Sequence, residues 1–243
     1  MMKVNDFINQ LKKALGSHTV YATGAFGASI GNYPSQAQRY YTNMYDAVYK
    51  EDKAAGKSDD YAKKDAEVWG QKVLTAAKTK PCFAFDCVGL VKGILWGWDA
   101  KAKDVYGGAD YESNGVPDAG ARSDGLISYC KDVTTNFSKI VPGEMLWLDG
   151  HVGVYIGNDI AIECTTGWTD NVLKSVVTNI RAAKSGEYGR KWAKHGKLPW
   201  VDYNVSPSTS YSVVIEDCAT KADAEKIQAA LKTLGTNSVI KEK

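Results

Sequence analysis

Apolar residues recur three or four positions apart near the N-terminus, and Gly16 follows the last of them. This spacing predicts a helix with one apolar face, ended by the glycine. Polar residues interrupt the apolar ones, so the segment is not expected to be a signal peptide. No stretch of the chain approaches the roughly 18 apolar residues that a membrane span needs. The apolar positions of the predicted helix are Val4, Phe7, Ile8, Leu11 and Leu15.

A second helical pattern begins directly after Asp86, whose carboxylate is well suited to cap a helix N-terminus. Cys87 is then the first helical residue, where the helix dipole and unpaired N–H groups are expected to lower the pKa of its thiol. The same N–H groups are candidates for an oxyanion hole. The alternative interpretation is a buried, inert cysteine. One face of this helix is expected to be buried, formed by Cys87, Leu90, Val91, Ile94, Leu95 and Trp98.

Alternating apolar residues predict a β-hairpin further along the chain. Its first strand begins at His151, its loop is 157–159, and its second strand is 160–164. A three-residue loop pairs Ile156 with Ile160 and Gly153 with Glu163, which puts all the aliphatic side chains on one face. His151 and Glu163 then share the other face as diagonal neighbours. Glu163 is therefore expected to orient the imidazole, the alternative being an exposed glutamate on an edge strand.

The chain contains only three histidines, which narrows the choice of a general base. His18 and His195 fall in predicted loops, whereas His151 opens a strand. A cysteine at a helix start and a histidine at a strand start form the pair that papain-like cysteine hydrolases use. We therefore expect Cys87 to be the nucleophile, His151 the base and Glu163 the orienting group.

These segments resemble the NlpC family of cell-wall cysteine peptidases: residues 86–91 (DCVGLV), 142–144 (PGE) and 150–157 (GHVGVYIG). The resemblance implies an α+β, papain-like NlpC fold in which the Cys-bearing helix packs on a small antiparallel sheet. It implies hydrolysis of an amide bond in the peptidoglycan stem peptide, most often between D-glutamate and a diamino acid. A finer resemblance, over residues 4–203, is to phage endolysins of Gram-positive hosts. It depends on residues 21–27 (YATGAFG), 86–96, 162–167 and 192–200.

The family places a tyrosine upstream of the cysteine, and the resemblance gives that oxyanion-hole role to Tyr21. It also implies substrate binding by Asp86, Val88 and Gly150, although the family usually has serine where this chain has Val88. Three other functions remain open. They are an N-acetylmuramoyl-L-alanine amidase with the same triad, a non-catalytic wall-binding protein, and a papain-fold toxin or deamidase that acts on a protein.

Composition agrees with a globular protein that acts on the cell wall. The net charge of +2 over 243 residues gives no strong attraction to nucleic acid. The five cysteines include no Cys-x-x-Cys pair and the histidines are scattered, so neither zinc nor any other cofactor is expected. With no export signal predicted, the thiols are expected to be reduced. The endolysin resemblance implies that the protein stays in the host cytoplasm until a holin releases it to the wall.

The chain divides into three predicted parts: a catalytic domain over 1–203, a linker over 204–210 and a small β-α-β module over 211–243. Within the first part, residues 35–80 form a helical insert whose tyrosine stripe packs on the core or lines the substrate cleft, and 106–124 is a loop of cleft-lining length. The module begins its helix with a capping box at Thr220 and weakly resembles half of a SPOR-type peptidoglycan-binding domain. A two-stranded sheet alone is marginal, so the module must either dock on the catalytic domain or pair with a second copy. We expect pairing, which gives a homodimer, and the SPOR resemblance implies wall binding.

Overall fold

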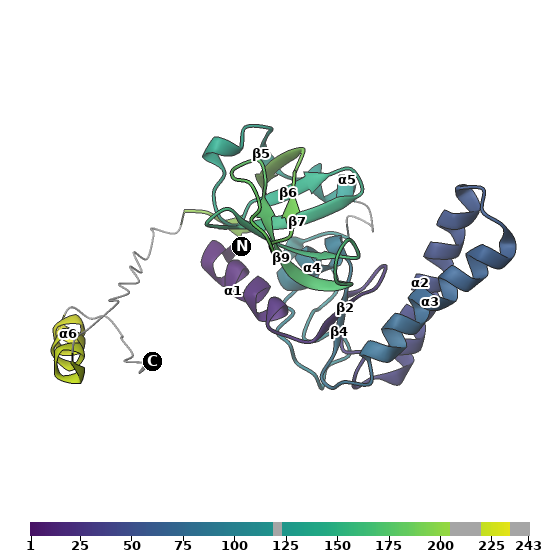
Figure 1. Cartoon of the computed structure of the whole chain (residues 1–243), viewed down its shortest axis with the longest axis horizontal. Helices are drawn as coiled ribbons and strands as arrows, with labels where there is room; N and C mark the ends of the chain where they lie inside the picture. Colours follow the sequence, from purple (N-terminus) through teal and green to yellow (C-terminus); the bar gives the residue numbers. More distant parts are fainter. Residues whose placement is uncertain (119–122, 205–219, 234–243) are drawn as a thin grey trace. The chain divides into compact units, whose positions relative to one another are not determined.

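The computed structural model describes residues 1–118, 123–204 and 220–233. The chain separates into two compact units, 1–205 and 206–243, and the boundary falls within the segment whose composition predicts a linker. The larger unit is an α+β structure with three sheets (Figure 1).

The largest sheet has seven strands in the order β10-β9-β8-β7-β6-β11-β5. Its neighbouring strands run antiparallel, except that β10 pairs with β9 in parallel. Chain order therefore differs from sheet order at β11, which inserts between β5 and β6. The strands are β5 (Lys131–Thr134), β6 (Met145–Leu148), β7 (His151–Gly157), β8 (Ile160–Thr165), β9 (Asn171–Val177), β10 (Gly189–Arg190) and β11 (Lys194–Lys197).

Two smaller sheets join distant parts of the chain. In one, β4 is the central strand and pairs in parallel with β2 and antiparallel with β3. In the other, β1 pairs in parallel with β12, which joins the two ends of the larger unit. The strands are β1 (Met2–Lys3), β2 (Thr19–Tyr21), β3 (Phe26–Ala28), β4 (Phe83–Phe85) and β12 (Val201–Asp202).

Six α-helices and two short 3₁₀ turns are present in the described residues. The α-helices are α1 (Val4–Leu15), α2 (Pro34–Ala54), α3 (Asp59–Ala76), α4 (Cys87–Leu95), α5 (Ser123–Ile127) and α6 (Lys221–Thr233); the 3₁₀ turns are η1 (Ser113–Gly115) and η2 (Phe137–Lys139). The predicted N-terminal helix is confirmed as α1, and its apolar face packs into the main core. No described helix is both long enough and apolar enough to cross a membrane.

Helix α4 lies at the centre of the larger unit and packs against β7 and β8 of the large sheet. The predicted buried face is confirmed, and burial extends further than predicted, because all nine residues of the helix are buried. Gly89 and Gly93 explain the difference. A Cβ atom at Gly89 would lie 1.9 Å from the carbonyl oxygen of Ala25, and one at Gly93 would lie 2.2 Å from that of Phe26. The two glycines, one helical turn apart, let the backbone of Ala25 and Phe26, at the start of β3, approach the second face of α4.

The polar insert forms a hairpin of α2 and α3, two long helices that project from the rest of the larger unit (Figure 1). The connection between them is short, because α2 continues to Ala54 and α3 begins at Asp59. The tyrosine stripe divides between two environments. Tyr40 and Met44 are buried in a core cluster, whereas the rings of Tyr41, Tyr45 and Tyr49 stack along α2 at 6.3 Å intervals.

In the smaller unit, the structure describes α6 and Thr220. One half of the predicted capping box is present: the amide of Asp223 donates to the Thr220 hydroxyl oxygen at 3.2 Å. The Asp223 carboxylate accepts from that hydroxyl, at 2.7 Å. The two predicted strands of the module, 211–215 and 238–240, lie outside the described residues.

Candidate active site

The β7–β8 hairpin has the predicted register in the part away from its turn. Val154 pairs with Ile162, and a Cβ atom at Gly153 would lie 3.3 Å from the Cβ of Glu163, so Gly153 faces Glu163 as expected. The aliphatic side chains of Val152, Val154 and Ile162 pack into the main core with α4. The His151 and Glu163 side chains therefore lie on the opposite face of the sheet.

The predicted turn of this hairpin is wrong. Its loop has two residues, because Gly157 pairs with Ile160 and the register shifts between Tyr155 and Gly157. Asn158 and Asp159 both have positive φ angles, of 52° and 62°. A two-residue turn with two positive φ angles matches the twist of the flanking strands, and the bulge at Ile156 absorbs the extra residue.

Glu163 is fully buried, so the alternative of an exposed edge-strand glutamate is wrong. Its Oε2 lies 2.6 Å from Nε2 of His151. The same oxygen lies 2.7 Å from Nε of Arg190, and Oε1 accepts a hydrogen bond from the Ser175 hydroxyl. The structure thus joins the predicted base and orienting group directly, and adds two partners of the carboxylate that the sequence pattern did not identify.

The His151 ring is held at its edge by Glu163 and on one face by a tryptophan. It stacks on Trp192, with 5.6 Å between ring centroids and 15° between planes. Trp192 is buried and belongs to a cluster that covers this face of the sheet. With Nε2 bonded to Glu163 and one ring face against Trp192, Nδ1 is the ring nitrogen left to accept a proton.

Cys87 is the first residue of α4 and is buried. The backbone N–H of Val152, the residue after His151, acts on its thiol together with those of Val88 and of Cys87 itself. Helix α4 packs against β7 and β8, and Cys87 and Val152 belong to the same core cluster. The three elements that carry the predicted triad therefore meet: α4, β7 and β8.

The expectation that the helix start lowers the pKa of Cys87 is wrong. Burial raises this pKa to about 12, and the charge of the neighbouring Asp86 adds to the effect, although three backbone N–H groups oppose it. Desolvation of a thiolate outweighs the helix N-terminus here. A pKa raised in this way favours the neutral thiol over the thiolate near neutral pH.

Tyr21 lies close to Cys87, as the oxyanion-hole role requires. It pairs with Phe85 in the parallel β2–β4 ladder, two residues before Cys87. Burial raises the pKa of its hydroxyl far above the ordinary value, and the charges of Cys87 and Asp86 raise it further. The hydroxyl is therefore a hydrogen-bond donor at every physiological pH.

The three residues assigned to substrate binding lie in different environments. The Val88 side chain is fully buried in the main core, so only its backbone N–H faces the thiol. Gly150 is exposed in the β6–β7 turn with a φ of 74°. Asp86 is buried, and its carboxylate accepts hydrogen bonds from the amides of Gly89 and Gly24, the latter at 2.7 Å. These two hydrogen bonds therefore connect the start of α4 to the loop after β2.

A pH-dependent stability follows from Asp86. Burial raises the pKa of its carboxyl from 3.8 to about 6 in the folded protein. A raised folded-state pKa contributes stability below the unfolded value that is lost as pH rises through the folded value. Compared with Asp86→Asn, the wild-type protein is expected to lose about 3 kcal/mol of unfolding free energy between about pH 4 and pH 7.

Urea denaturation of both proteins across this range measures the difference. Asp132→Asn is the control, because the Asp132 side chain is 69% exposed and should follow the wild-type curve. Parallel curves for the wild type and Asp86→Asn would contradict the burial argument.

His195, predicted in a loop, lies in β11 between β5 and β6, and that expectation is wrong. It is buried, with Nδ1 bonded to the Glu144 carboxyl and Nε2 donating to the carbonyl oxygen of Asn136 at 3.1 Å. Both ring nitrogens are therefore engaged in structural contacts. The short, basic segment around His195 lacks alternating apolar residues, so its sequence did not predict a strand.

A pocket of about 340 Å³ opens beside the N-terminus of α4. Gly89 of α4 and its N-cap residue Asp86 line the pocket, and so do Tyr106 and Tyr111 from the long loop that the sequence predicts to border a cleft. The remaining lining residues include aromatic and oppositely charged side chains: Gly24, Phe26, Arg39, Lys92, Trp96 and Asp118. Asp86, the residue before Cys87, thus borders this space, although Cys87 and His151 do not line it.

Within residues 1–118, 123–204 and 220–233, no three His, Cys, Asp or Glu side chains gather closely enough to hold a metal ion. Comparison of the chain with protein-family models found no match, and comparison with curated proteins also found none.

Proposed function

We propose that this protein is a peptidoglycan hydrolase with a papain-like NlpC fold, similar to phage endolysins, that cleaves an amide bond in the stem peptide. The D-γ-glutamyl–diamino acid bond is the proposed target. The observation that carries the proposal is the bond of 2.6 Å between His151 and a fully buried Glu163, on strands against which the Cys87 helix packs.

The proposed reaction begins with proton transfer. Glu163 accepts the Nε2–H of His151, so Nδ1 is unprotonated and takes the Cys87 proton as the sulfur attacks the amide carbon. The backbone N–H of Cys87 and the Tyr21 hydroxyl stabilise the oxyanion. His151 then returns the proton to the leaving amine, and the C–N bond breaks. Water activated by His151 hydrolyses the resulting thioester and restores the thiol.

The charge state of Cys87 suits a concerted transfer. Because burial raises the pKa of the thiol to about 12, the free protein holds little thiolate that could react with oxidants or other electrophiles. The thiol becomes nucleophilic only as His151 removes its proton. The pocket beside α4, with both signs of charge and several aromatic rings, supports binding of a zwitterionic stem peptide.

Digestion of purified walls from several Gram-positive species, read by mass spectrometry, tests the function. New amines on the diamino acid with free glutamyl carboxyls mean endopeptidase activity. Peptides released whole from muramic acid mean an amidase with the same residues. Intact walls from every species would contradict the proposal, and wall pelleting without cleavage would indicate a binding protein.

We also propose that the endolysin-like protein accumulates in the host cytoplasm and reaches the wall when a holin opens the membrane. The smaller unit is proposed to bind the wall and to dimerise. Light scattering is expected to find a dimer for the full chain and a monomer for a chain ending at Asn204, which should keep hydrolysis and bind walls less tightly. A monomeric full-length protein at tens of micromolar would contradict the dimer.

A further inference from the structure

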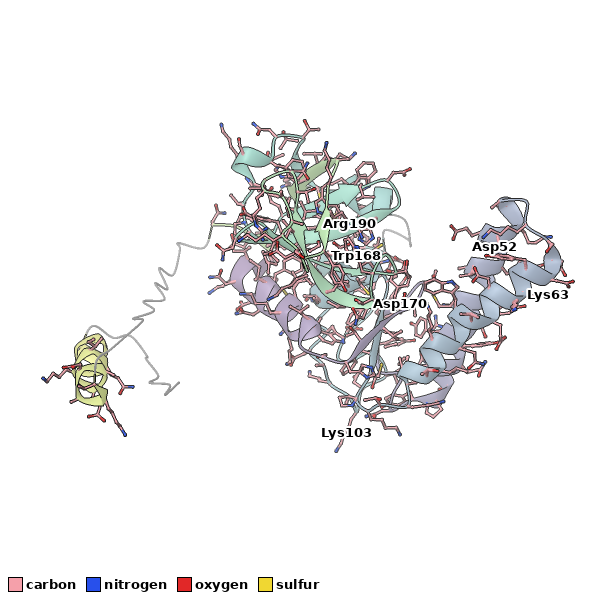
Figure 2. The ribbon with its side chains drawn as sticks, in the orientation of Figure 1. Asp52, Lys63, Lys103, Trp168, Asp170 and Arg190 are labelled. Carbon is pink, nitrogen blue, oxygen red and sulfur yellow. The ribbon has the colours of Figure 1, made fainter. Side chains whose placement is uncertain are left out.

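Arg190 is placed against the carboxylate of the candidate triad. Its Nε lies 2.7 Å from Oε2 of Glu163, and its Nη2 donates to the Thr165 hydroxyl at 3.2 Å. The guanidinium carbon lies 4.5 Å from the centroid of the Trp168 ring, and Figure 2 shows the two residues side by side at the sheet. It also lies 5.7 Å from the centroid of Trp192. Ion pair, hydrogen bond and aromatic rings thus hold the guanidinium in one position.

Trp192 and Glu163 link Arg190 to His151 by two routes. His151 and Arg190 contact the same carboxylate oxygen, Oε2 of Glu163. The ring of Trp192 also stacks with His151 and lies near the guanidinium. A change at Arg190 is therefore expected to act on His151 through Glu163 and Trp192.

The charge balance at this site explains why a cation is needed. A fully buried carboxylate is strongly destabilised unless a positive charge neutralises it. Two groups in contact with Glu163 can carry that charge: Arg190, which is always protonated, and His151, which is cationic only as imidazolium. If His151 supplied the charge, it would already hold the proton that a base must accept.

Other titratable groups near the pair are Cys87 and Asp86 at the start of α4, Tyr21 of β2 and Cys164 of β8. The charges of Asp86, Cys87 and Glu163 each raise the pKa of Cys164, and the charge of Cys87 raises that of Tyr21, so these groups are electrostatically coupled. Each of the four is either neutral or negative. None of them can therefore take the place of Arg190 as the countercharge of Glu163.

We propose that Arg190 is a positioning residue that supplies the countercharge of Glu163, so that His151 stays neutral and able to accept the Cys87 proton. The proposal rests on the proposed function, because it assigns a role within the same triad. It predicts that without Arg190 the buried carboxylate holds His151 as imidazolium near neutral pH.

The test compares Arg190→Gln, Arg190→Lys and the matched control Arg181→Gln. Arg181 pairs with Glu187 at 2.8 Å and lies apart from the triad, so its variant should retain wild-type hydrolysis. Arg190→Gln is expected to lose about 10-fold or more in wall hydrolysis near pH 6.5 and to recover much of it near pH 9, because high pH deprotonates His151. Arg190→Lys keeps the positive charge but loses the planar guanidinium with its several N–H donors. It should therefore retain most of the wild-type rate at neutral pH.

A loss of rate that is equal at every pH, or no loss at all, would overturn the proposal. A second measurement needs no substrate: nitrogen-15 spectra of the imidazole rings, with the His151 signal identified by its absence from His151→Ala. The wild-type ring is expected to be protonated at Nε2 only near pH 7, and the ring of Arg190→Gln at both nitrogens.

The spectra keep the two proposals separable. A doubly protonated His151 in the wild-type protein at neutral pH would overturn the role of Arg190, even if Arg190→Gln did not fold. A wild-type protein with the expected ring state but no wall hydrolysis would contradict the proposed function and leave the role of Arg190 standing.

Discussion

Replacing Cys87 with serine is expected to abolish wall hydrolysis, with a loss of at least about 10³-fold and no loss of fold. Serine is close to cysteine in size, so the buried start of α4 should be retained, with thermal unfolding close to that of the wild type. A hydroxyl gives up its proton far less readily than a thiol, and His151 is too weak a base to compensate. Release of soluble wall fragments measures the effect.

Cys130→Ser is the matched control for this variant. Cys130 is partly buried against the same core, and burial raises the pKa of its thiol to about 12 as well. It lies outside the triad, so Cys130→Ser should clear a wall suspension at the wild-type rate. Clearing by Cys87→Ser would mean that another residue is the nucleophile.

Replacing His151 with alanine is expected to have the second large effect. Hydrolysis should fall by about 10³-fold or more, because no other group can take the Cys87 proton. Glu163→Gln should reduce the rate less, by about 10²-fold, because the base remains but its tautomer is held poorly. The glutamine amide can donate to Nε2 and favour the wrong tautomer, and Arg190 loses its counterion.

Rates of the two variants on the same wall preparation check this order. His18→Ala is the control, since His18 is an exposed histidine whose ring Nδ1 contacts the carbonyl oxygen of Thr79. Wild-type activity in Glu163→Gln would show that the buried carboxylate does not orient His151. Equal losses in His151→Ala and His18→Ala would contradict the choice of base.

Local patterns predicted the elements that carry the site. The helix starting at Cys87 follows from the N-cap residue Asp86, and the side of β7 and β8 that carries His151 and Glu163 follows from the alternation of aliphatic residues. Both are consequences of short-range geometry: capping acts within one helical turn, and strand faces alternate every two residues. The turn of the hairpin was predicted wrongly, because a β-bulge changes the number of residues in the loop without changing the hydrophobic pattern of the strands.

Long-range packing decided the rest. The pKa of Cys87 depends on burial in the folded core, which outweighs the effect of the helix start and which no pattern near residue 87 reveals. The strand identity of His195 depends on insertion between β5 and β6.

The sequence by itself determined which residue types stand at a helix start and on one strand face, and thereby the pairing of His151 with Glu163. Only the tertiary structure brought Arg190, 27 positions after Glu163, against the same carboxylate through the parallel β9–β10 pairing. The physical reason is that sequence periodicity reports how one element alternates between buried and exposed positions. A countercharge for a buried group can come from any element that packs against it, so its position along the chain carries no periodic signal.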